Sequence, residues 1–216
     1  MKSRAFFYSS IVFVLLCTGA SPVFAHKPTY VDKQISVEVK NPDISQAFYG
    51  ELAGESVTYT VFVPESLNVY TGLLVPDQES SRIDVVVDMY NSKQELMYTL
   101  KSDVWNTYFE EFARDDYLKG PEYKTVVPAG KYTLVVSNPD NQGKYVLVIG
   151  TKERFLLQEM PRIFDQLIKV KMNTFGKPWY SAFMNIFGIG TGIILLFLVG
   201  IVVLIQRVVF RKKKKR

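Results

Sequence analysis

The segment KYTLVVSNPDNQGKYVLVIG, residues 131–150, contains two short β-rich runs separated by a cluster of turn residues. The runs at 131–137 and 144–150 are dominated by Tyr, Val, Leu and Ile, which favour β-strands. Between them, NPDNQG at 138–143 combines Asn, Asp, Pro and Gly, the residue types that favour turns. The segment therefore predicts two strands joined as a β-hairpin.

Short runs of the same kind occur throughout residues 30–150, and no long helical period interrupts them. In VTYTVFV, residues 57–63, Val and Tyr occupy every second position, as expected of a strand with one buried face. RIDVVVDMY, residues 82–90, is equally rich in β-formers. Seven to nine strands at this spacing predict a mainly β fold, an antiparallel β-sandwich or jelly roll over residues 26–150.

Glycine and aromatic spacing at both ends of this body resembles the bacterial pre-peptidase C-terminal domain family, over residues 45–75 and 125–150. The resemblance is carried by Gly50, Leu52, Tyr59, Ala129, Gly130, Tyr132, Leu134, Gly143, Tyr145 and Leu147. It implies a small extracellular β-sandwich of the kind usually appended to secreted hydrolases, involved in binding or secretion and without catalytic residues. Here no hydrolase accompanies the module, and a long apolar segment follows it.

That apolar segment is FMNIFGIGTGIILLFLVGIVVLIQ, residues 183–206, and it carries no charge. As a helix it would be about 36 Å long at about 1.5 Å per residue, enough to cross a bilayer core of about 30 Å. Trp179 and Tyr180 precede it, where aromatic rings favour the lipid headgroups. A basic tail, residues 207–216, follows it. We therefore expect one transmembrane helix. The residues expected to anchor it are Trp179, Tyr180, Arg207, Arg211, Lys212 and Lys213.

The distribution of charge sets the expected orientation and partners. Residues 26–150 carry 11 Lys and Arg against 18 Asp and Glu, a net charge of −7, whereas residues 207–216 carry 7 basic residues and no acidic one. Positive residues stay on the cytoplasmic side, so we expect a single-pass type I protein of the cell membrane, with its tail against anionic lipid headgroups. A nucleic-acid binder usually places basic residues on its folded domain. We expect no nucleic-acid partner.

Residues 1–25 have the pattern of a secretory signal peptide. Lys2 and Arg4 precede an apolar stretch, and a small residue, Ala25, ends the segment, so cleavage is expected after it. An uncleaved N-terminal anchor is the alternative. Lipidation at Cys17, the only cysteine, is disfavoured because the bulky Leu16 precedes it. Removal of residues 1–25 would leave a chain without cysteine.

Residues 151–182 differ from the body, because apolar residues recur there at helical spacing. The expected apolar stripe consists of Phe164, Leu167, Ile168 and Met172, with Arg162, Asp165, Lys169 and Lys171 on other faces. Pro161 fits a first helical turn, and Gly176 to Pro178 fit its end. We expect a juxtamembrane amphipathic helix that lies on the membrane or packs on the sandwich.

Gly188 and Gly192 stand four residues apart within the apolar segment. Small residues at this spacing allow close approach of two membrane helices. They predict helix association, and hence a homodimer as one possible partner arrangement.

Residues able to support catalysis are scarce. His26 is the only histidine, which disfavours zinc because no second imidazole is available, and we expect it to be an ordinary exposed residue. Asp115, Asp116 and Glu122 lie in a polar stretch that predicts either a Ca²⁺ site or a solvated acidic loop. No other cofactor is expected.

Aromatic residues concentrate between positions 98 and 123. Trp105, Tyr108 and Tyr117 are candidate ligand-binding residues, if their rings are exposed; the alternative is that these bulky rings belong to the core. We expect a membrane-anchored, non-catalytic module that docks a protein partner or serves as a subunit of a surface assembly. Carbohydrate or polymer adhesion by the aromatics of residues 98–123 is the alternative. A carboxylate-based hydrolase is less favoured, because no spacing supports one.

Overall fold

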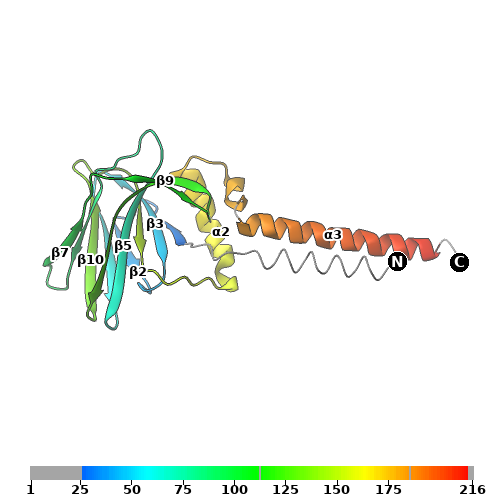
Figure 1. Cartoon of the computed structure of the whole chain (residues 1–216), viewed down its shortest axis with the longest axis horizontal. Coiled ribbons are helices and arrows are strands. Elements are labelled where there is room, and N and C mark those ends of the chain that lie inside the picture. Colours follow the sequence, from blue (N-terminus) through cyan, green and yellow to red (C-terminus); the bar gives the residue numbers. More distant parts are fainter. Residues whose placement is uncertain (1–25, 112, 185, 214–216) are drawn as a thin grey trace.

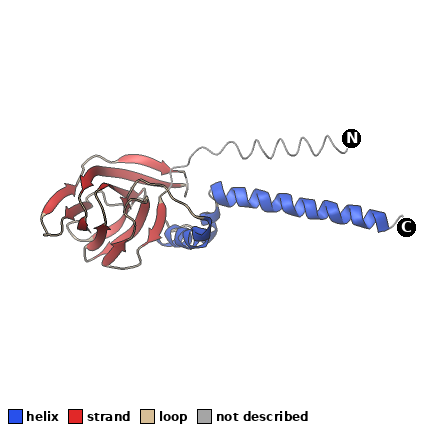
Figure 2. Cartoon of the chain, turned by 90° about the horizontal axis from the view of Figure 1, so that it is seen from below, coloured by secondary structure: helices blue, strands red, loops and turns tan. Residues whose placement is uncertain are grey.

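The computed structural model describes residues 26–111, 113–184 and 186–213 of the chain. The expected signal peptide and the cleavage position after Ala25 lie outside the described residues, as does Phe112. Within them, 11 strands form two sheets that face each other, and helices gather at one end (Figures 1 and 2). The prediction of a mainly β fold with two sheets in a sandwich-like arrangement is confirmed.

The larger sheet has six strands in the order β1-β3-β11-β5-β9-β8, and the smaller has five in the order β2-β4-β10-β6-β7. The six-stranded sheet contains β1 (Lys27–Tyr30), β3 (Gln46–Ala53), β11 (Gln142–Ile149), β5 (Leu67–Pro76), β9 (Asp115–Val127) and β8 (Asn106–Glu110). The five-stranded sheet contains β2 (Ser36–Val39), β4 (Val57–Val63), β10 (Gly130–Ser137), β6 (Val86–Tyr90) and β7 (Leu96–Leu100).

The predicted hairpin at residues 131–150 is wrong. Both strands exist, but β10 lies in the five-stranded sheet and β11 in the six-stranded sheet, so the turn between them crosses from one sheet to the other. Alternating apolar residues predict the strand, whereas the partner of the strand depends on long-range pairing. The antiparallel expectation also fails at two edges, where β1 pairs with β3 and β2 with β4 in parallel.

The core between the sheets is built from the alternating residues of the strands. On β4, Tyr59, Val61 and Val63 are fully buried, while Phe62 between them is exposed. Tyr59 meets Tyr145 of the opposite sheet, and their hydroxyl oxygens lie 2.9 Å apart. The ring of Tyr145 lies over Gly50, where a Cβ atom would sit 2.4 Å from it. This close approach requires glycine.

The other face of the six-stranded sheet is covered by the segment after β11. It comprises the 3₁₀-helix η1 (Leu157–Glu159), the α-helix α2 (Met160–Lys169), the π-helix η2 (Val170–Thr174) and the 3₁₀-helix η3 (Trp179–Phe183). Val170 packs there against a second apolar cluster that includes Ala47, Tyr49 and Val148. The amphipathic helix therefore packs on the sandwich, one of the two expected arrangements.

The apolar stripe of this helix differs from the prediction. Ile163, Leu167 and Val170 are buried, whereas Met172 is 50% exposed and Lys171 is buried. The reason is the π-helical turn at η2, because its wider i→i+5 spacing changes which residues face the sheet. Pro161 stands in the first turn of α2, as predicted.

The last element, α3 (Ile186–Lys213), is a 28-residue helix that projects away from the sandwich (Figures 1 and 2). Within the described ranges, no helix combines the length and the hydropathy of a membrane span. Gly188 lies against the Phe183 carbonyl, where a Cβ atom would come within 2.0 Å of the oxygen, whereas Gly192 faces open space. Gly188 thus allows the close approach of the backbone to Phe183 at the start of α3. Helix association through the two glycines stays a prediction.

Candidate functional site

The three predicted ligand-binding aromatics do not share one face. Trp105 is half-buried against the core between the sheets, and its indole nitrogen donates to the Ser102 carbonyl at 3.0 Å. Tyr117 is fully buried on the opposite side of the six-stranded sheet, with its hydroxyl 3.0 Å from that of Tyr49. Tyr108 is half-buried near Tyr117. Of the three, Tyr108 lines a pocket, which is described below.

The three predicted calcium ligands are also separated. Asp115 and Asp116 point to opposite faces of β9, and Asp115 is fully buried while Asp116 is exposed. Glu122 accepts a hydrogen bond from Tyr70 at 2.6 Å and forms an ion pair with Lys119 at 2.7 Å. Among the described residues, no three His, Cys, Asp or Glu side chains are grouped so that they could hold a metal ion. Asp115 and Glu122 instead form ion pairs with lysines.

Asp115 is held by two lysines from the helical segment. Lys171 and Lys177 approach its two carboxylate oxygens at 2.7 and 2.8 Å, and Lys171 also donates to the Ala113 carbonyl. Burial lowers the pKa of Lys171, while the charge of Asp115 acts in the opposite direction. We name Asp115, Lys171 and Lys177 the Asp115 clamp. It fixes the segment after α2 to strand β9.

The prediction that His26 is an ordinary exposed residue is wrong. It is half-buried, and its Nδ1 hydrogen-bonds to the Ser45 hydroxyl. Burial occurs because β1 starts at the next residue and pairs with β3, which fixes the imidazole over the outer face of the six-stranded sheet. Sequence alone could not show this, because β1 is only four residues long.

His26 lines a small cavity of about 200 Å³, which we name the His26 pocket. Its polar lining combines one imidazole, one ammonium, one carboxylate and two phenols over an apolar floor. These residues are His26, Tyr70, Tyr108, Lys119 and Glu122, with Leu74 and Val148 among the floor residues. Two of them, Tyr108 and Glu122, were candidates from the sequence in other roles. Tyr70 and Lys119 become visible only once β5, β8 and β9 are paired.

The charges in the His26 pocket interact. Burial lowers the pKa of His26, Lys119 lowers it further, and Glu122 raises it by less. Burial raises the pKa of Glu122, but hydrogen bonds from Lys119 and Tyr70 outweigh this effect and bring it below its usual value. Burial and the bond to Glu122 raise the pKa of Tyr70. Near neutral pH the pocket therefore contains a neutral imidazole beside a Lys–Glu ion pair.

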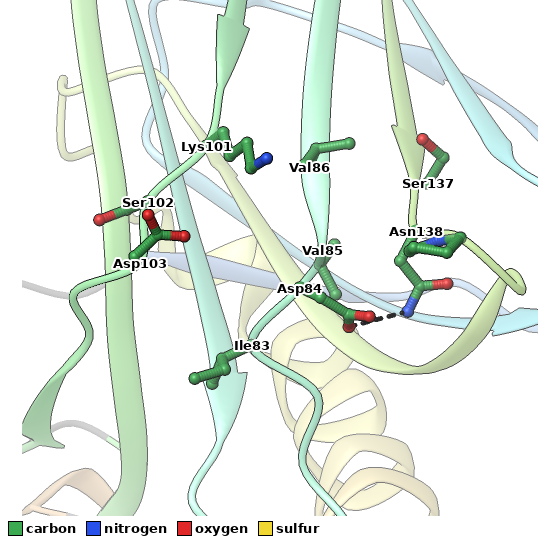
Figure 3. A pocket seen from close by; sticks show the side chains of 10 residues that line it. Ile83, Asp84, Val85, Val86, Lys101, Ser102, Asp103, Ser137 and Asn138 are labelled. Atoms are coloured by element: carbon green, nitrogen blue, oxygen red, sulfur yellow. Dashed lines mark hydrogen bonds between the residues drawn. The ribbon is translucent and has the colours of Figure 1, made fainter.

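A larger cleft of about 620 Å³ opens at one end of the five-stranded sheet (Figure 3), and we name it the β6–β10 cleft. Three segments, residues 83–86, 101–103 and 137–139, lie side by side around it. Lys101, Asp103 and Asp84 supply charged groups, and Ile83 is 45% exposed at the edge. Sequence reasoning did not identify this site, because its residues come from loops and strand ends of three strands.

The wall of the β6–β10 cleft is held by side-chain bonds. Asn138 donates to Asp84 at 3.3 Å and to the Gln142 carbonyl at 2.8 Å. Arg82 bridges Asp84 and Asp140 at 2.6 and 2.9 Å, and its hydrogen bonds lower the pKa of both carboxyls. The loop after β10 and the segment before β6 are thereby joined.

The predicted membrane-anchoring residues lie at both ends of the apolar segment. Trp179 and Tyr180 are exposed, and their rings contact each other in an edge-to-face arrangement. Arg207 is exposed on α3. Arg211, Lys212 and Lys213 form the end of α3, but their side chains lie outside the described residues.

Comparisons with known proteins give weak similarities only. No family model and no curated protein matches the chain. The pre-peptidase C-terminal domain of a collagenase from Bacillus anthracis is 15% identical with a TM-score of 0.37, and the match covers 56% of this chain and 99% of that domain. CorA, a surface-associated copper-binding protein of Methylomicrobium album BG8, is 7% identical with a TM-score of 0.31, covering 57% and 100%.

A β-glucosidase from Paenibacillus barengoltzii is 10% identical with a TM-score of 0.27, and the match covers 60% of this chain and 14% of that enzyme. Similarities at this level of identity and TM-score assign neither a family nor a function. The β-sandwich is established by the sheet topology of the chain itself.

Proposed function

We propose that this chain is a non-catalytic binding module that docks a protein partner through the β6–β10 cleft and is held at the cell membrane by its apolar segment, residues 183–206, and the basic tail after it. The observation that carries the proposal is the cleft itself, which is open, has a volume of about 620 Å³ and combines an exposed apolar edge with charged groups. Interfaces between proteins typically combine an apolar anchor with a polar rim.

Two features support a protein as the partner. Ile83 at the edge and Val104, which follows the lining residue Asp103, are 45% and 69% exposed, so apolar contact area is available. The bonds of Asn138 and Arg82 hold the wall in one conformation before a partner arrives. A preformed site loses less conformational entropy on binding.

Membrane anchoring is supported by the sequence from 178 to 206, which contains no charged residue, and by the basic tail after it. The apolar side chains of α3 that the structure describes, such as Leu196 and Val199, are exposed rather than packed on the sandwich. Trp179 and Tyr180 directly precede the apolar segment, and aromatic residues at this position of a sequence are typical of a lipid interface. The sandwich would lie outside the cell and the tail in the cytoplasm.

Site-specific photo-crosslinking in native membranes tests the docking site. A photoreactive residue at Ser102, inside the cleft, should give a crosslinked band of defined mass, and Ile83→Asp should remove it. A photoreactive residue at Lys131 is the matched control, because Lys131 is exposed near the other end of β10. Equal crosslinking from both positions, or none from Ser102, would reject the cleft as the docking site.

A further inference from the structure

We infer that the His26 pocket is a binding site for a small carboxylate anion, separate from the β6–β10 cleft. The pocket lies on the outer face of the six-stranded sheet and is lined from β5, β8, β9 and the residue before β1. The cleft belongs to the five-stranded sheet. The inference therefore does not depend on the proposed protein partner.

Hydrogen-bond donors in the pocket are available to a ligand. The Tyr108 hydroxyl makes no hydrogen bond to any described residue. The Lys119 ammonium has three N–H donors, and one of them is directed at Glu122. His26 uses Nδ1 on Ser45, which leaves Nε2 for a ligand. An ammonium, a phenol and an imidazole together match the two acceptor oxygens of a carboxylate.

Glu122 is the one carboxylate among the residues that line the pocket. It does not repel a bound carboxylate strongly, because its charge is already compensated. Oε1 of Glu122 accepts from both Tyr70 and Lys119, at 2.6 and 2.7 Å. Lys119 lines the pocket beside His26, and the N–H donors of its ammonium that Glu122 does not use can form charge-assisted hydrogen bonds to an anion.

Volume and floor limit the size of the ligand. About 200 Å³ accommodates a molecule of a few heavy atoms, and Leu74 and Val148 give the floor an apolar character. Gly72, which lines the pocket, contributes no side chain to fill it. A carboxylate with a short alkyl group, such as propionate, satisfies both the polar rim and the apolar floor.

Binding should change the titration of His26. The charged and titratable groups facing the imidazole are Lys119 and Glu122 on β9, Tyr70 on β5 and Tyr108 on β8. Adding an anion beside the imidazole favours its protonated form, so a bound carboxylate raises the pKa of His26. By linkage, the carboxylate binds more tightly at pH values below that pKa.

His26 is the only histidine of the chain, so its imidazole gives a single resolvable NMR signal. The experiment titrates the purified full-length chain with pH, in propionate and in chloride at equal ionic strength, after intact mass has defined the N-terminus. We expect saturating propionate to raise the pKa of His26 by about one pH unit, which corresponds to about tenfold tighter binding to the imidazolium form. Equal titration curves in both salts would overturn the inference.

Two variants locate the anion. Lys119→Met and Tyr108→Phe each remove a proposed donor, and we expect each to reduce the propionate effect at least several-fold. Lys131→Met and Tyr90→Phe are matched controls on the five-stranded sheet and should retain the full effect. A propionate effect that survives in both Lys119→Met and Tyr108→Phe would place the anion elsewhere and reject the site.

Discussion

Asp115 on β9 and Lys171 in η2 form an ion pair of 2.7 Å whose side chains are 0% and 3% exposed. The two residues belong to the sandwich and to the helical segment that follows it, so the buried pair joins two parts of the chain. Lys177 shares the carboxylate at 2.8 Å from a more exposed position. The helical segment is thereby fixed to the sheet and cannot act as a free linker.

We predict that Asp115→Asn strongly destabilises the protein. The substitution leaves the Lys171 ammonium buried without a counter-charge, and removing one partner of a buried pair costs about 3–5 kcal/mol. Chemical denaturation followed by tryptophan fluorescence measures the change, because Trp179 lies in the segment that the clamp holds.

Asp165→Asn is the control for this prediction, because the pair of Asp165 with Lys169 is exposed and spans one turn of α2. Its effect on the free energy of unfolding should be small, because exposed ion pairs contribute little to stability. Lys171→Met should cost less than Asp115→Asn, since Lys177 still neutralises Asp115. Equal losses for the exposed and the buried pair would show that the clamp does not stabilise the fold.

The hydrogen-bonded hydroxyls of Tyr59 and Tyr145 should contribute to stability as a coupled pair. They lie 2.9 Å apart and join the two sheets in the buried core, where burial raises the pKa of both phenols. Replacing either tyrosine by phenylalanine leaves one buried hydroxyl without its partner, at a cost of about 1–3 kcal/mol. The double variant should cost less than the sum of the two single variants. A double-mutant cycle on unfolding free energies measures this, and strict additivity would exclude the coupling.

Gly50→Ala should destabilise the sandwich through steric overlap. The added methyl would meet the ring of Tyr145 at 2.4 Å, and relief requires movement of a ring packed between two sheets. We expect a loss of about 1–3 kcal/mol, the usual range for overpacking. Gly130→Ala is the comparison, because its methyl would meet Tyr132 at an ordinary 3.6 Å. The thermal midpoints of the two variants should differ accordingly; a Gly50→Ala protein as stable as wild type would contradict the packing.

Local features of the fold could be predicted from the sequence, because they depend on neighbouring residues. The alternation of β4 and the start of α2 near Pro161 both follow from periodicity and backbone chemistry. Sheet membership could not be predicted. The four turn residues between β10 and β11 are compatible with a hairpin and with a crossing between sheets, and only pairing with β4 and β3 decides which one forms.

The candidate sites show the same limit. Tyr108 and Glu122 drew attention as an aromatic and a carboxylate, but their shared pocket requires Lys119, Tyr70 and His26 from other parts of the sequence. Lys171 seemed to belong to a polar face, because an ideal helix was assumed where the chain forms a π-turn. Burial of a charge opposite Asp115 is a property of the assembled sheet and helix.

A final prediction concerns stability between pH 7.5 and 5.5. The pKa of His26 lies below 6.5 in the folded chain, mainly because the imidazole is buried, so the unfolded chain binds the proton more readily. The free energy of unfolding should therefore fall as the pH drops below about 6.5. The lowered pKa values of Asp84 and Glu122 affect stability only at more acidic pH, near and below their usual values of 3.8 and 4.5.

Replacing His26 by Gln keeps a polar side chain but removes this titration, so stability of the His26→Gln variant should remain nearly constant over the same interval. Denaturant midpoints at five pH values in chloride measure the difference between the two proteins. Propionate should reduce the decrease in the wild-type free energy of unfolding at low pH, because a carboxylate beside the imidazole stabilises its protonated form. It should leave His26→Gln unchanged. An identical pH dependence of both proteins would show that His26 has the same pKa in the folded and unfolded chain. That result would contradict the lowering of the His26 pKa by burial and by Lys119.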